Sequence, residues 1–378
     1  MSRSTDERET RLRQAIGMPL AQLESPALVL RHDVLLRNLD SMAGFAAAHG
    51  IKLRPHAKAH KSVRIAAMQI ERGAVGVCVQ KLSEAEALAA GGITNIFLSN
   101  EVVNRAKLAR VIALARKITL SVTVDSEAGI ALLADVADAA GVNLDVLVEV
   151  DIGQSRCGTE PENAGLLAAQ LLRRGLRFAG LHAYQGKAQH IAALLERETA
   201  VAAANAKTAL ARHAVEAQGI ACPLITGGGT GTFAIDARNG IYDEIQPGSY
   251  VFMDRDYQRI EAAPADPVFG NTLFVKSEVI STAPAHAVVD AGHKAHAIDS
   301  GMPAVWGRQL EYLAGGDEHG VLSGPQHEMP ALGECVWLIP GHCDPTVNLY
   351  DYYVVVEGDL ENGTVIDIWP IEARGCLT

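Results

Sequence analysis

The stretch KLRPHAKAHKS (52–62) contains a short extended run that is followed at once by a lysine among other cations. Pro55 cannot continue a central ladder and favours extended geometry in the residue before it, which predicts a strand over residues 52–55. Lys58 follows this strand and is flanked by two histidines and a second lysine. Nearby cations disfavour another ammonium, so we expect a neutral amine, the form that a Schiff base with an aldehyde cofactor requires. On this segment alone, a solvated loop lysine is the alternative.

Further apolar runs follow the first one and alternate with Ala- and Leu-rich stretches of helical spacing. The eight runs are KLRP (52–55), VGVCV (75–79), NIFLS (95–99), ITLSVTV (118–124), LDVLVEV (144–150), FAGLHAY (178–184), PLITG (223–227) and YDEIQ (242–246). Alternation of strands and helices predicts a parallel sheet. Eight strands in about 200 residues favour a (β/α)8 TIM barrel over a doubly wound sheet. The doubly wound alternative is also disfavoured because no G-x-G-x-x-G motif follows the first strand.

Polar residues gather at the same end of each predicted strand. They include His56 and Lys58, Gln80 and Lys81, Asn100 and Glu101, Asp125, Asp151 to Arg156, Tyr184 to His190, Gly227 to Thr232, and Gln246 to Tyr250. The carboxyl ends of barrel strands carry the active site in enzymes of this architecture. We therefore expect the functional residues at this rim of the barrel.

The residue composition and the spacing of apolar residues change from about residue 263. β-Branched and aromatic runs separated by turns replace the helical patterns, which predicts a second, mostly antiparallel β domain. The runs are NTLFVKSEVI, HAVVDAG, ECVWLIPG, YDYYVVVEG and GTVIDIWPI. We expect an α/β chain with a barrel over residues 32–262 and a β domain over 263–378, which residues 1–31 would join.

A glycine-rich loop follows the seventh run. The sequence ITGGGTGTF (225–233) has three consecutive glycines, which let backbone N–H groups crowd around an anion, and threonines that offer hydroxyls. The eighth run is followed by QPGSY (246–250). Loops after strands seven and eight form the usual phosphate site of such barrels, so we expect phosphate binding here. A plain turn is the alternative for a glycine run taken alone.

The segment PGHCDPTVNLYD (340–351) carries a candidate metal pair. His342 and Asp344 are two residues apart, so in an extended segment they would project to the same face, with Cys343 opposite. Two protein ligands leave positions open, as a catalytic metal requires. The carboxylate favours Mn²⁺ or Mg²⁺, with Zn²⁺ also compatible. A hydrogen-bonded pair at a turn is the alternative, and the acidic GGDEHG cluster (315–320) is a candidate for orienting the pair.

Composition restricts the class of protein. The 378 residues are 48% hydrophobic and carry a formal net charge of −11, which makes nucleic acid and anionic membranes poor partners. No run approaches the roughly 18 apolar residues of a spanning helix, and the charged N-terminus does not resemble a secretory signal. The six cysteines lack paired spacing and are expected to be reduced thiols. These features predict a cytoplasmic location.

Several motifs together resemble those of the fold-type III pyridoxal phosphate enzymes, the alanine racemase superfamily. Within it, the chain is similar to the D-threonine aldolase and D-serine dehydratase-like branch. The matching segments are RPHAKAHK, VCVQKLSEAEA, VEVDIGQSRCG, GLHAYQGKAQH, TGGGTGTF, EIQPGSYVFMD, DEHGV and PGHCDPTVN. They occur in order over nearly the whole chain, and the resemblance implies a homodimer.

The resemblance implies roles for the matched residues. Lys58 would hold the pyridoxal 5'-phosphate covalently, and Arg156 would approach its phenolic oxygen. The remaining cofactor-binding residues would be Gln80, Tyr184, Gly228, Gly229, Thr230, Gln246, Gly248 and Ser249. Gln246 replaces the arginine that racemases place opposite the pyridine nitrogen, and a glutamine cannot protonate the ring.

The resemblance also implies a divalent metal and a base. His342 and Asp344 match the metal ligands of the family, where dehydratases of this branch resemble His-x-Cys and aldolases read His-x-Asp as this chain does. His190 resembles the residue proposed as catalytic base in these aldolases, although a lone histidine is more often structural. A bound divalent ion can lower the pKa of a substrate β-hydroxyl, which assists cleavage of the Cα–Cβ bond.

The implied activity is an aldehyde-lyase reaction that converts D-threonine to glycine and acetaldehyde. The alternative is a 3-hydroxy-D-aspartate aldolase that gives glycine and glyoxylate, for which Lys187 or Arg255 could bind the distal carboxylate. A D-serine dehydratase-like lyase is a further alternative. A racemase would need a second acid–base residue, usually a tyrosine from the β domain, that the sequence does not identify. A non-catalytic pyridoxal phosphate carrier would lack the second domain and its metal pair.

Overall fold

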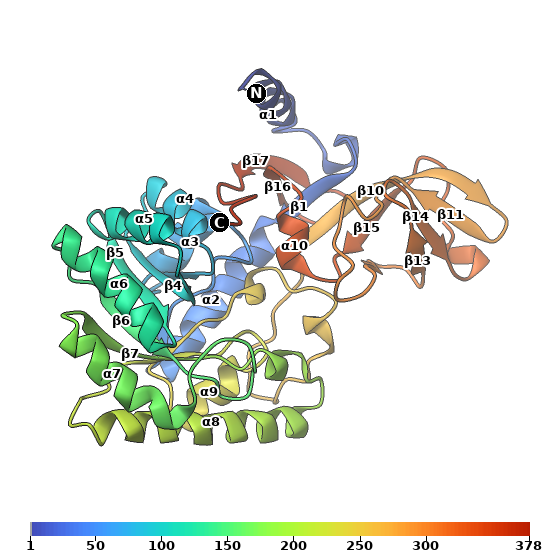
Figure 1. Cartoon of the computed structure of the whole chain (residues 1–378). Coiled ribbons are helices and arrows are strands. Elements are labelled where there is room, and N and C mark those ends of the chain that lie inside the picture. The colour runs from blue at the N-terminus through green and yellow to red at the C-terminus, as the bar shows by residue number, and fades with distance from the viewer. Residues whose placement is uncertain (1) are drawn as a thin grey trace.

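The computed structural model describes residues 2–378 and contains two β-sheets, which lie side by side in Figure 1. The first is an eight-stranded sheet whose neighbouring strands are all parallel, in the order β2-β9-β8-β7-β6-β5-β4-β3. Its strands are β2 (Lys52–Leu53), β3 (Val77–Val79), β4 (Asn95–Glu101), β5 (Thr119–Val124), β6 (Asp145–Glu149), β7 (Arg177–Ala183), β8 (Ile225–Gly227) and β9 (Glu244–Ile245). Each of the eight predicted runs overlaps one of them, which confirms the predicted parallel sheet.

The two strands at the ends of this order, β2 and β3, meet through a parallel bridge between His56 and Cys78. The Ala57 amide donates to the Cys78 carbonyl at 2.8 Å, and the Cys78 amide donates to the Pro55 carbonyl at 2.8 Å. This contact brings the ends of the sheet together, so the sheet curves into a TIM-like barrel. The doubly wound alternative is thereby excluded.

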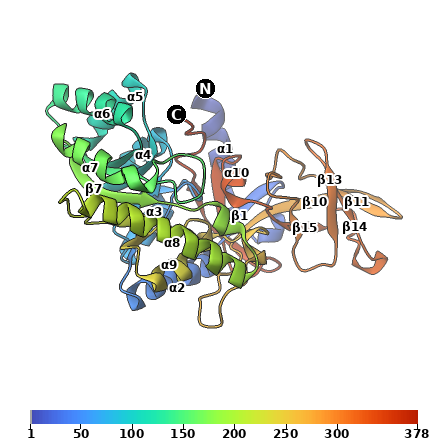
Figure 2. The ribbon, with the colours of Figure 1, turned by 60° about the horizontal axis from the view of Figure 1, so that its bottom comes forward.

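Helices connect successive strands and cover the outside of the sheet (Figures 1 and 2). They are α2 (His32–Ala48), α3 (Val63–Glu71), α4 (Leu82–Ala90), α5 (Arg105–Ala115), α6 (Glu127–Ala140), α7 (Ala164–Arg173), α8 (Leu194–Glu216) and α9 (Phe233–Asn239). Helix α6 shows why the sequence folds this way locally. The Ser126 hydroxyl accepts from the Gly129 amide at its start, and Gly141 adopts φ 62° at its end. No helix within residues 2–378 has the length and apolar character to cross a bilayer.

The second sheet has nine strands and is antiparallel except where β1 pairs with β16. Its strands are β1 (Ala27–Arg31), β10 (Leu273–Ala283), β11 (His286–Val289), β12 (Ala304–Val305), β13 (Glu311–Gly315), β14 (Gly320–Ser323), β15 (Cys335–Ile339), β16 (Tyr352–Glu357) and β17 (Thr364–Pro370). An additional β10–β11 pairing closes six of the strands into a small barrel. The predicted second, mostly antiparallel β domain is therefore confirmed.

Two short helical elements accompany the second sheet. Helix α1 (Ser2–Gln14) precedes β1, which lies between β10 and β16 although it comes before the whole parallel sheet in sequence. Helix α10 (Cys343–Val347) lies between β15 and β16. Figure 1 shows α10 on the side of the second sheet that faces the parallel barrel. This position matters because α10 carries the predicted metal pair.

Candidate active site

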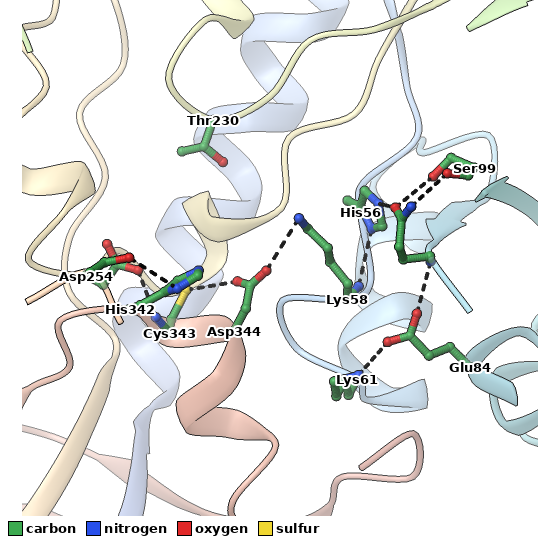
Figure 3. Close-up of polar contacts among 12 residues, drawn as sticks. His56, Lys58, Lys61, Glu84, Ser99, Thr230, Asp254, His342, Cys343 and Asp344 are labelled. Carbon is green, nitrogen blue, oxygen red and sulfur yellow. Dashed lines mark hydrogen bonds and ion pairs between the residues drawn. The ribbon is translucent and has the colours of Figure 1, made fainter. Parts of the chain in front are cut away.

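Lys58 and Asp344 face each other across the junction of the two sheets. The Lys58 Nζ lies 3.8 Å from the Asp344 Oδ2 (Figure 3). The Lys58 side chain is 43% exposed and that of Asp344 16%, so an incoming molecule can reach the amine. Burial lowers the pKa of the Lys58 amine, but the Asp344 carboxylate and the Tyr184 phenol raise it, and the net direction is above the ordinary value. The predicted neutral amine is therefore wrong for the chain as described.

The cations beside Lys58 in sequence do not act on it as predicted. Lys61 turns away from Lys58 and pairs with Glu84 (Figure 3). Burial lowers the pKa of His60 to about 4 and that of His56 well below its ordinary value, so both imidazoles are neutral near pH 7. The charge that faces the Lys58 amine is instead a carboxylate from a distant part of the chain, which sequence proximity could not reveal.

A small cavity lies beside Lys58 at the carboxyl ends of the parallel strands. Its lining combines five of the predicted cofactor residues with three others: Lys58, Gln80, Arg156, Tyr184 and Gln246, together with His56, Ser99 and His182. Residues from β2 to β9 thus converge on one space, as expected of a barrel rim. Lys58 and Arg156 are the Lys and Arg side chains of this lining, which contains no Asp or Glu.

Polar contacts hold the lining residues in place. The Gln80 amide nitrogen donates to the Ser99 carbonyl at 2.9 Å, and the Gln246 amide nitrogen donates to the Thr226 hydroxyl at 2.8 Å. The Arg156 guanidinium carbon lies 5.6 Å from the centre of the Tyr184 ring, within cation–π range. These contacts fix the orientation of the side chains before any ligand enters.

The two predicted phosphate loops lie next to each other. The Thr230 hydroxyl accepts from the Tyr250 amide at 3.1 Å, which ties the loop after β8 to the loop after β9. A Cβ on Gly248 would stand 3.0 Å from the His56 carbonyl, so this loop also packs against the segment that leads to Lys58. The structure thereby brings Gly228, Gly229, Thr230, Gly248 and Ser249 to the same rim as Lys58.

The predicted metal pair lies at the start of α10. The extended geometry predicted for this segment is wrong, because residues 343–347 are helical with His342 at the N-cap position. The Thr346 hydroxyl donates to the His342 carbonyl at 2.8 Å, and the Asp254 carboxylate accepts from the Cys343 amide at 2.8 Å. These polar partners satisfy the helix terminus and stabilise the turn.

The surroundings of His342 also differ from the expectation. Its Nδ1 lies 2.6 Å from the Asp299 Oδ2, which leaves Nε2 available for a ligand. Burial lowers the pKa of His342, but the Asp344 and Asp299 carboxylates raise it, with a net upward shift. The GGDEHG acidic residues do not orient His342, because Asp317 and Glu318 are exposed and pair with Lys294. Among the side chains that the structure describes, no group of three or more His, Cys, Asp or Glu could hold a metal ion.

His190 lies outside the Lys58 cavity. It ends the short 3-10 helix η3 (Lys187–His190), and its side chain is 47% exposed. Its Nδ1 forms a hydrogen bond with Asp256, which also pairs with Arg259, and its ring centre lies 5.6 Å from that of buried Tyr257. The hydrogen bond to Asp256 occupies Nδ1 and leaves Nε2 as the other ring nitrogen of His190.

The remaining predicted side chains are peripheral. Lys187 is exposed, and Arg255 donates from Nη1 to the Met302 carbonyl at 2.8 Å. Neither residue lines the cavity beside Lys58.

Sequence reasoning missed the acidic partners that support the site. Asp299 holds His342, Asp256 holds His190, and Glu149 lies 3.2 Å from the His182 Nδ1 and 3.9 Å from Arg156. Burial beside Glu149 raises the pKa of Glu101 to about 7. Glu149 lies in the quoted VEVD segment, but no spacing rule singled it out. Asp299 and Asp256 lie in loops whose position depends on the tertiary fold.

Two family models match the chain in order. The model for the alanine racemase N-terminal domain matches residues 31–256, and a serine dehydratase domain model matches residues 272–356. The chain belongs to the alanine racemase superfamily of pyridoxal phosphate enzymes. The predicted family is therefore confirmed, and the cofactor of this family is pyridoxal phosphate.

Similar proteins narrow the class of enzyme. The chain is 42% identical to a 3-hydroxy-D-aspartate aldolase of Paracoccus denitrificans, over 95% of this chain and 94% of that protein. It is 44% identical to a D-threonine aldolase of an Arthrobacter species, over 95% of each chain. The crystal structure of D-threonine aldolase from Filomicrobium marinum superposes with a TM-score of 0.93 at 45% identity, covering 96% of this chain and 99% of that one. The chain is a lyase of the aldolase type.

Proposed function

We propose that this protein cleaves D-β-hydroxy-α-amino acids with pyridoxal 5'-phosphate and a divalent metal, and that D-threonine is converted to glycine and acetaldehyde. The observation that carries the proposal is the 3.8 Å approach of the Lys58 amine to the Asp344 carboxylate. With these roles, a covalent cofactor position and a metal position would be adjacent. A substrate held at its amino group would extend its β-hydroxyl toward α10.

The residues present fit pyridoxal phosphate. Lys58 would hold its aldehyde carbon, with Gln80, Arg156, Tyr184 and Gln246 around its ring, because these side chains line the cavity beside the amine. The Gly228–Thr230 and Gly248–Ser249 loops would receive its phosphate through backbone N–H groups and hydroxyls. When bound, the cofactor supplies the electron sink into which the Cα carbanion is delocalised.

The residues at α10 fit a divalent ion. His342 through Nε2 and Asp344 through its carboxylate would hold it, and Asp299 on Nδ1 fixes the tautomer and orientation that coordination requires. We propose Mn²⁺, with Mg²⁺ or Zn²⁺ compatible with the same donors. The ion would lower the pKa of the substrate β-hydroxyl.

His190 is the proposed base. Asp256 holds its Nδ1, so Nε2 would be the nitrogen that accepts the β-hydroxyl proton. The proposal further divides the chain into a cofactor-binding barrel over residues 32–262 and a metal-binding β domain over 263–378 with residues 1–31. It includes a homodimer in the cytoplasm.

A second candidate substrate is 3-hydroxy-D-aspartate. The observation that favours it is the 42% identity to an enzyme of that name, close to the 44% identity to the D-threonine aldolase. Its products would be glycine and glyoxylate. Arg255, whose guanidinium lies against the Met302 carbonyl, is the proposed partner of the distal carboxylate, with Lys187 as the other candidate.

One set of assays tests these proposals. Glycine release is measured from all four threonine isomers and from 3-hydroxy-D-aspartate, with and without Mn²⁺, and acetaldehyde and glyoxylate are quantified. We expect cleavage of D-threonine and D-allothreonine and rejection of both L-isomers, because Lys58 and the metal approach the substrate from fixed directions. Release of ammonia and a 2-oxo acid in place of glycine would show a dehydratase. Comparable cleavage of an L-isomer would contradict the proposed site geometry.

A further inference from the structure

A small chamber lies behind the glycine loop. Its polar lining consists of Gln185, Gln189, Asn205, Thr232, Asp236 and Tyr242. Gly228 also lines it, so the loop that would receive the cofactor phosphate forms one wall of the chamber. No role for this chamber is required by the aldolase reaction described above.

Asp236 packs directly against the glycine loop. A Cβ on Gly228 would stand 2.6 Å from the Asp236 Oδ2, which leaves no room for a side chain. Gly228 also has φ 70°, a backbone conformation that favours glycine. Gln189 supports the next part of the loop, because its Oε1 accepts from the Gly231 amide at 2.9 Å. The loop is therefore supported from behind by a carboxyl group and an amide group.

Thr232 connects Asp236 to the loop backbone. Its hydroxyl oxygen accepts from the Gln189 Nε2 at 2.8 Å and from the Gly229 amide at 3.3 Å, which uses both of its lone pairs. The hydroxyl hydrogen must then be donated to the Asp236 Oδ2, 2.5 Å away. A proton on Asp236 would accordingly sit on Oδ1, the oxygen that Thr232 does not contact.

The chamber gives Asp236 no compensating cation. Asp236 is 3% exposed, and no Lys, Arg or His in the described part of the chain forms an ion pair with it. Tyr242 is the other titratable group of the lining, and burial raises the pKa of its phenol, so it is neutral. Burial raises the pKa of Asp236 to about 7, although the Thr232 hydrogen bond acts in the opposite direction.

Asn205 offers an acceptor that suits a protonated carboxyl. It is 7% exposed, and both its Oδ1 and its Nδ2 lack a hydrogen-bond partner among the side chains and backbone that the structure describes. Buried polar groups without a partner are costly, so the chamber requires a donor that can satisfy Asn205, directly or through a buried water. An ionised Asp236 can accept from the Asn205 Nδ2 but cannot donate to the Asn205 Oδ1, whereas a neutral carboxylic acid can donate to that oxygen.

We propose that Asp236 is a positioning residue that supports the phosphate loop as a neutral carboxylic acid, so that binding of the cofactor phosphate is coupled to a proton on this buried side chain. The inference rests on the phosphate site of the proposed function. A phosphate dianion in front of the loop and a carboxylate behind it would repel each other at low local dielectric. The proton on Asp236 removes this repulsion without loss of the contact with Thr232.

The sign of the pH dependence follows from this coupling. The phosphate dianion raises the pKa of Asp236 further, so phosphate binding takes up a proton and weakens as the pH rises through about 7. The second ionisation of a phosphate monoester, near pH 6, is complete before this range. Over about two pH units, the preference for phosphate should fall by roughly 10- to 100-fold, the factor that corresponds to a pKa increase of about 1 to 2 units.

The test compares pyridoxal 5'-phosphate with pyridoxal, which lacks the phosphate. The full-length chain is freed of cofactor, and both dissociation constants are measured by absorbance titration between pH 7 and 9. Their ratio isolates the phosphate contribution, because effects of Lys58 act on both ligands. We expect the ratio to fall with pH in the wild type and to stay constant within about threefold in Asp236→Asn, which keeps the shape and cannot ionise.

Two further variants sharpen the test. Glu101→Gln removes another carboxyl with a pKa of about 7, half-buried on β4 and not in the chamber, and should keep the wild-type slope. Thr232→Val removes the hydrogen bond that lowers the pKa of Asp236, and should move the decline to higher pH.

A pH-independent ratio in the wild type would overturn the inference, as would loss of phosphate preference in Asp236→Asn at pH 7. An equal effect of Glu101→Gln would also overturn it. Absence of any borohydride-reducible cofactor in the wild type would instead contradict the proposed function.

Discussion

The segment around Lys58 and the segment around His342 face each other but are stabilised in different ways. The Lys58 segment is held by contacts within the parallel barrel, such as the pairing of residues 55–57 with Cys78 of β3. The α10 segment depends on distant carboxylates, because Asp254 holds the Cys343 amide and Asp299 holds His342. The barrel segment thus has its geometry set by regular strand pairing, and the α10 segment by individual polar side chains. Substitutions should expose this difference.

The largest expected effect is that of Lys58→Ala. This variant should lose the covalent cofactor link and at least about 10³-fold in turnover, because no other amine occupies the cavity. Borohydride reduction followed by mass spectrometry measures the link. Lys117→Ala, an exposed lysine remote from the cavity, serves as the control and should keep the link. A reducible bond that survives in Lys58→Ala would show that another residue holds the cofactor.

Asp344→Asn should impair the function of the α10 segment and leave that of the Lys58 segment intact. The amide keeps the size of the side chain but is a poorer ligand for a hard cation, so Mn²⁺-dependent turnover should fall by about 100-fold or more. Covalent cofactor binding should persist, because Lys58 and the glycine loops are unchanged. Turnover rates over a Mn²⁺ titration and the absorption spectrum provide the measurement. Wild-type turnover at wild-type Mn²⁺ concentrations would mean that Asp344 is not a ligand.

Asp299→Asn should have a smaller effect on the same segment. Partners that orient a metal-bound histidine typically contribute 10- to 100-fold in affinity, so the dissociation constant for Mn²⁺ should rise by about that factor. Saturating Mn²⁺ should restore most of the turnover, which it cannot do if Asp299 has a direct chemical role. Asp317→Asn, in the exposed pair with Lys294, is the matched control and should leave the metal affinity unchanged.

The smallest expected effect concerns stability. Chelation should abolish turnover yet lower Tm by no more than about 5 °C, because a ligand present at tens of times its Kd stabilises the fold by only about 2 kcal/mol. The turn at α10 is already held by Asp254 and Thr346 without an ion. Calorimetry with and without chelator gives the answer. Unfolding of the chelated protein at room temperature would identify a structural metal instead.

The regular parts of the fold could be predicted from the sequence because their periodicity is local. Eight apolar runs at regular spacing predicted the parallel barrel, and glycines after the seventh and eighth runs identified the loops that Thr230 and Tyr250 now connect. The short strands β12–β14 and helix α10 were not predicted. Too few residues form each of them for a periodic pattern, and contacts with distant residues stabilise them.

The sequence by itself determined the family and the barrel, and it predicted a functional lysine shortly after the first parallel strand. Only the tertiary structure decided the charge state around that lysine, because electrostatic interaction depends on distance in space and not along the chain. Lys61, three residues away, turns to Glu84, whereas Asp344, almost three hundred residues away, faces the amine. For the same reason, only the folded structure could show that Asp236 packs against the glycine loop. Burial and the missing counter-ion, which set its proton affinity, are properties of the packed molecule.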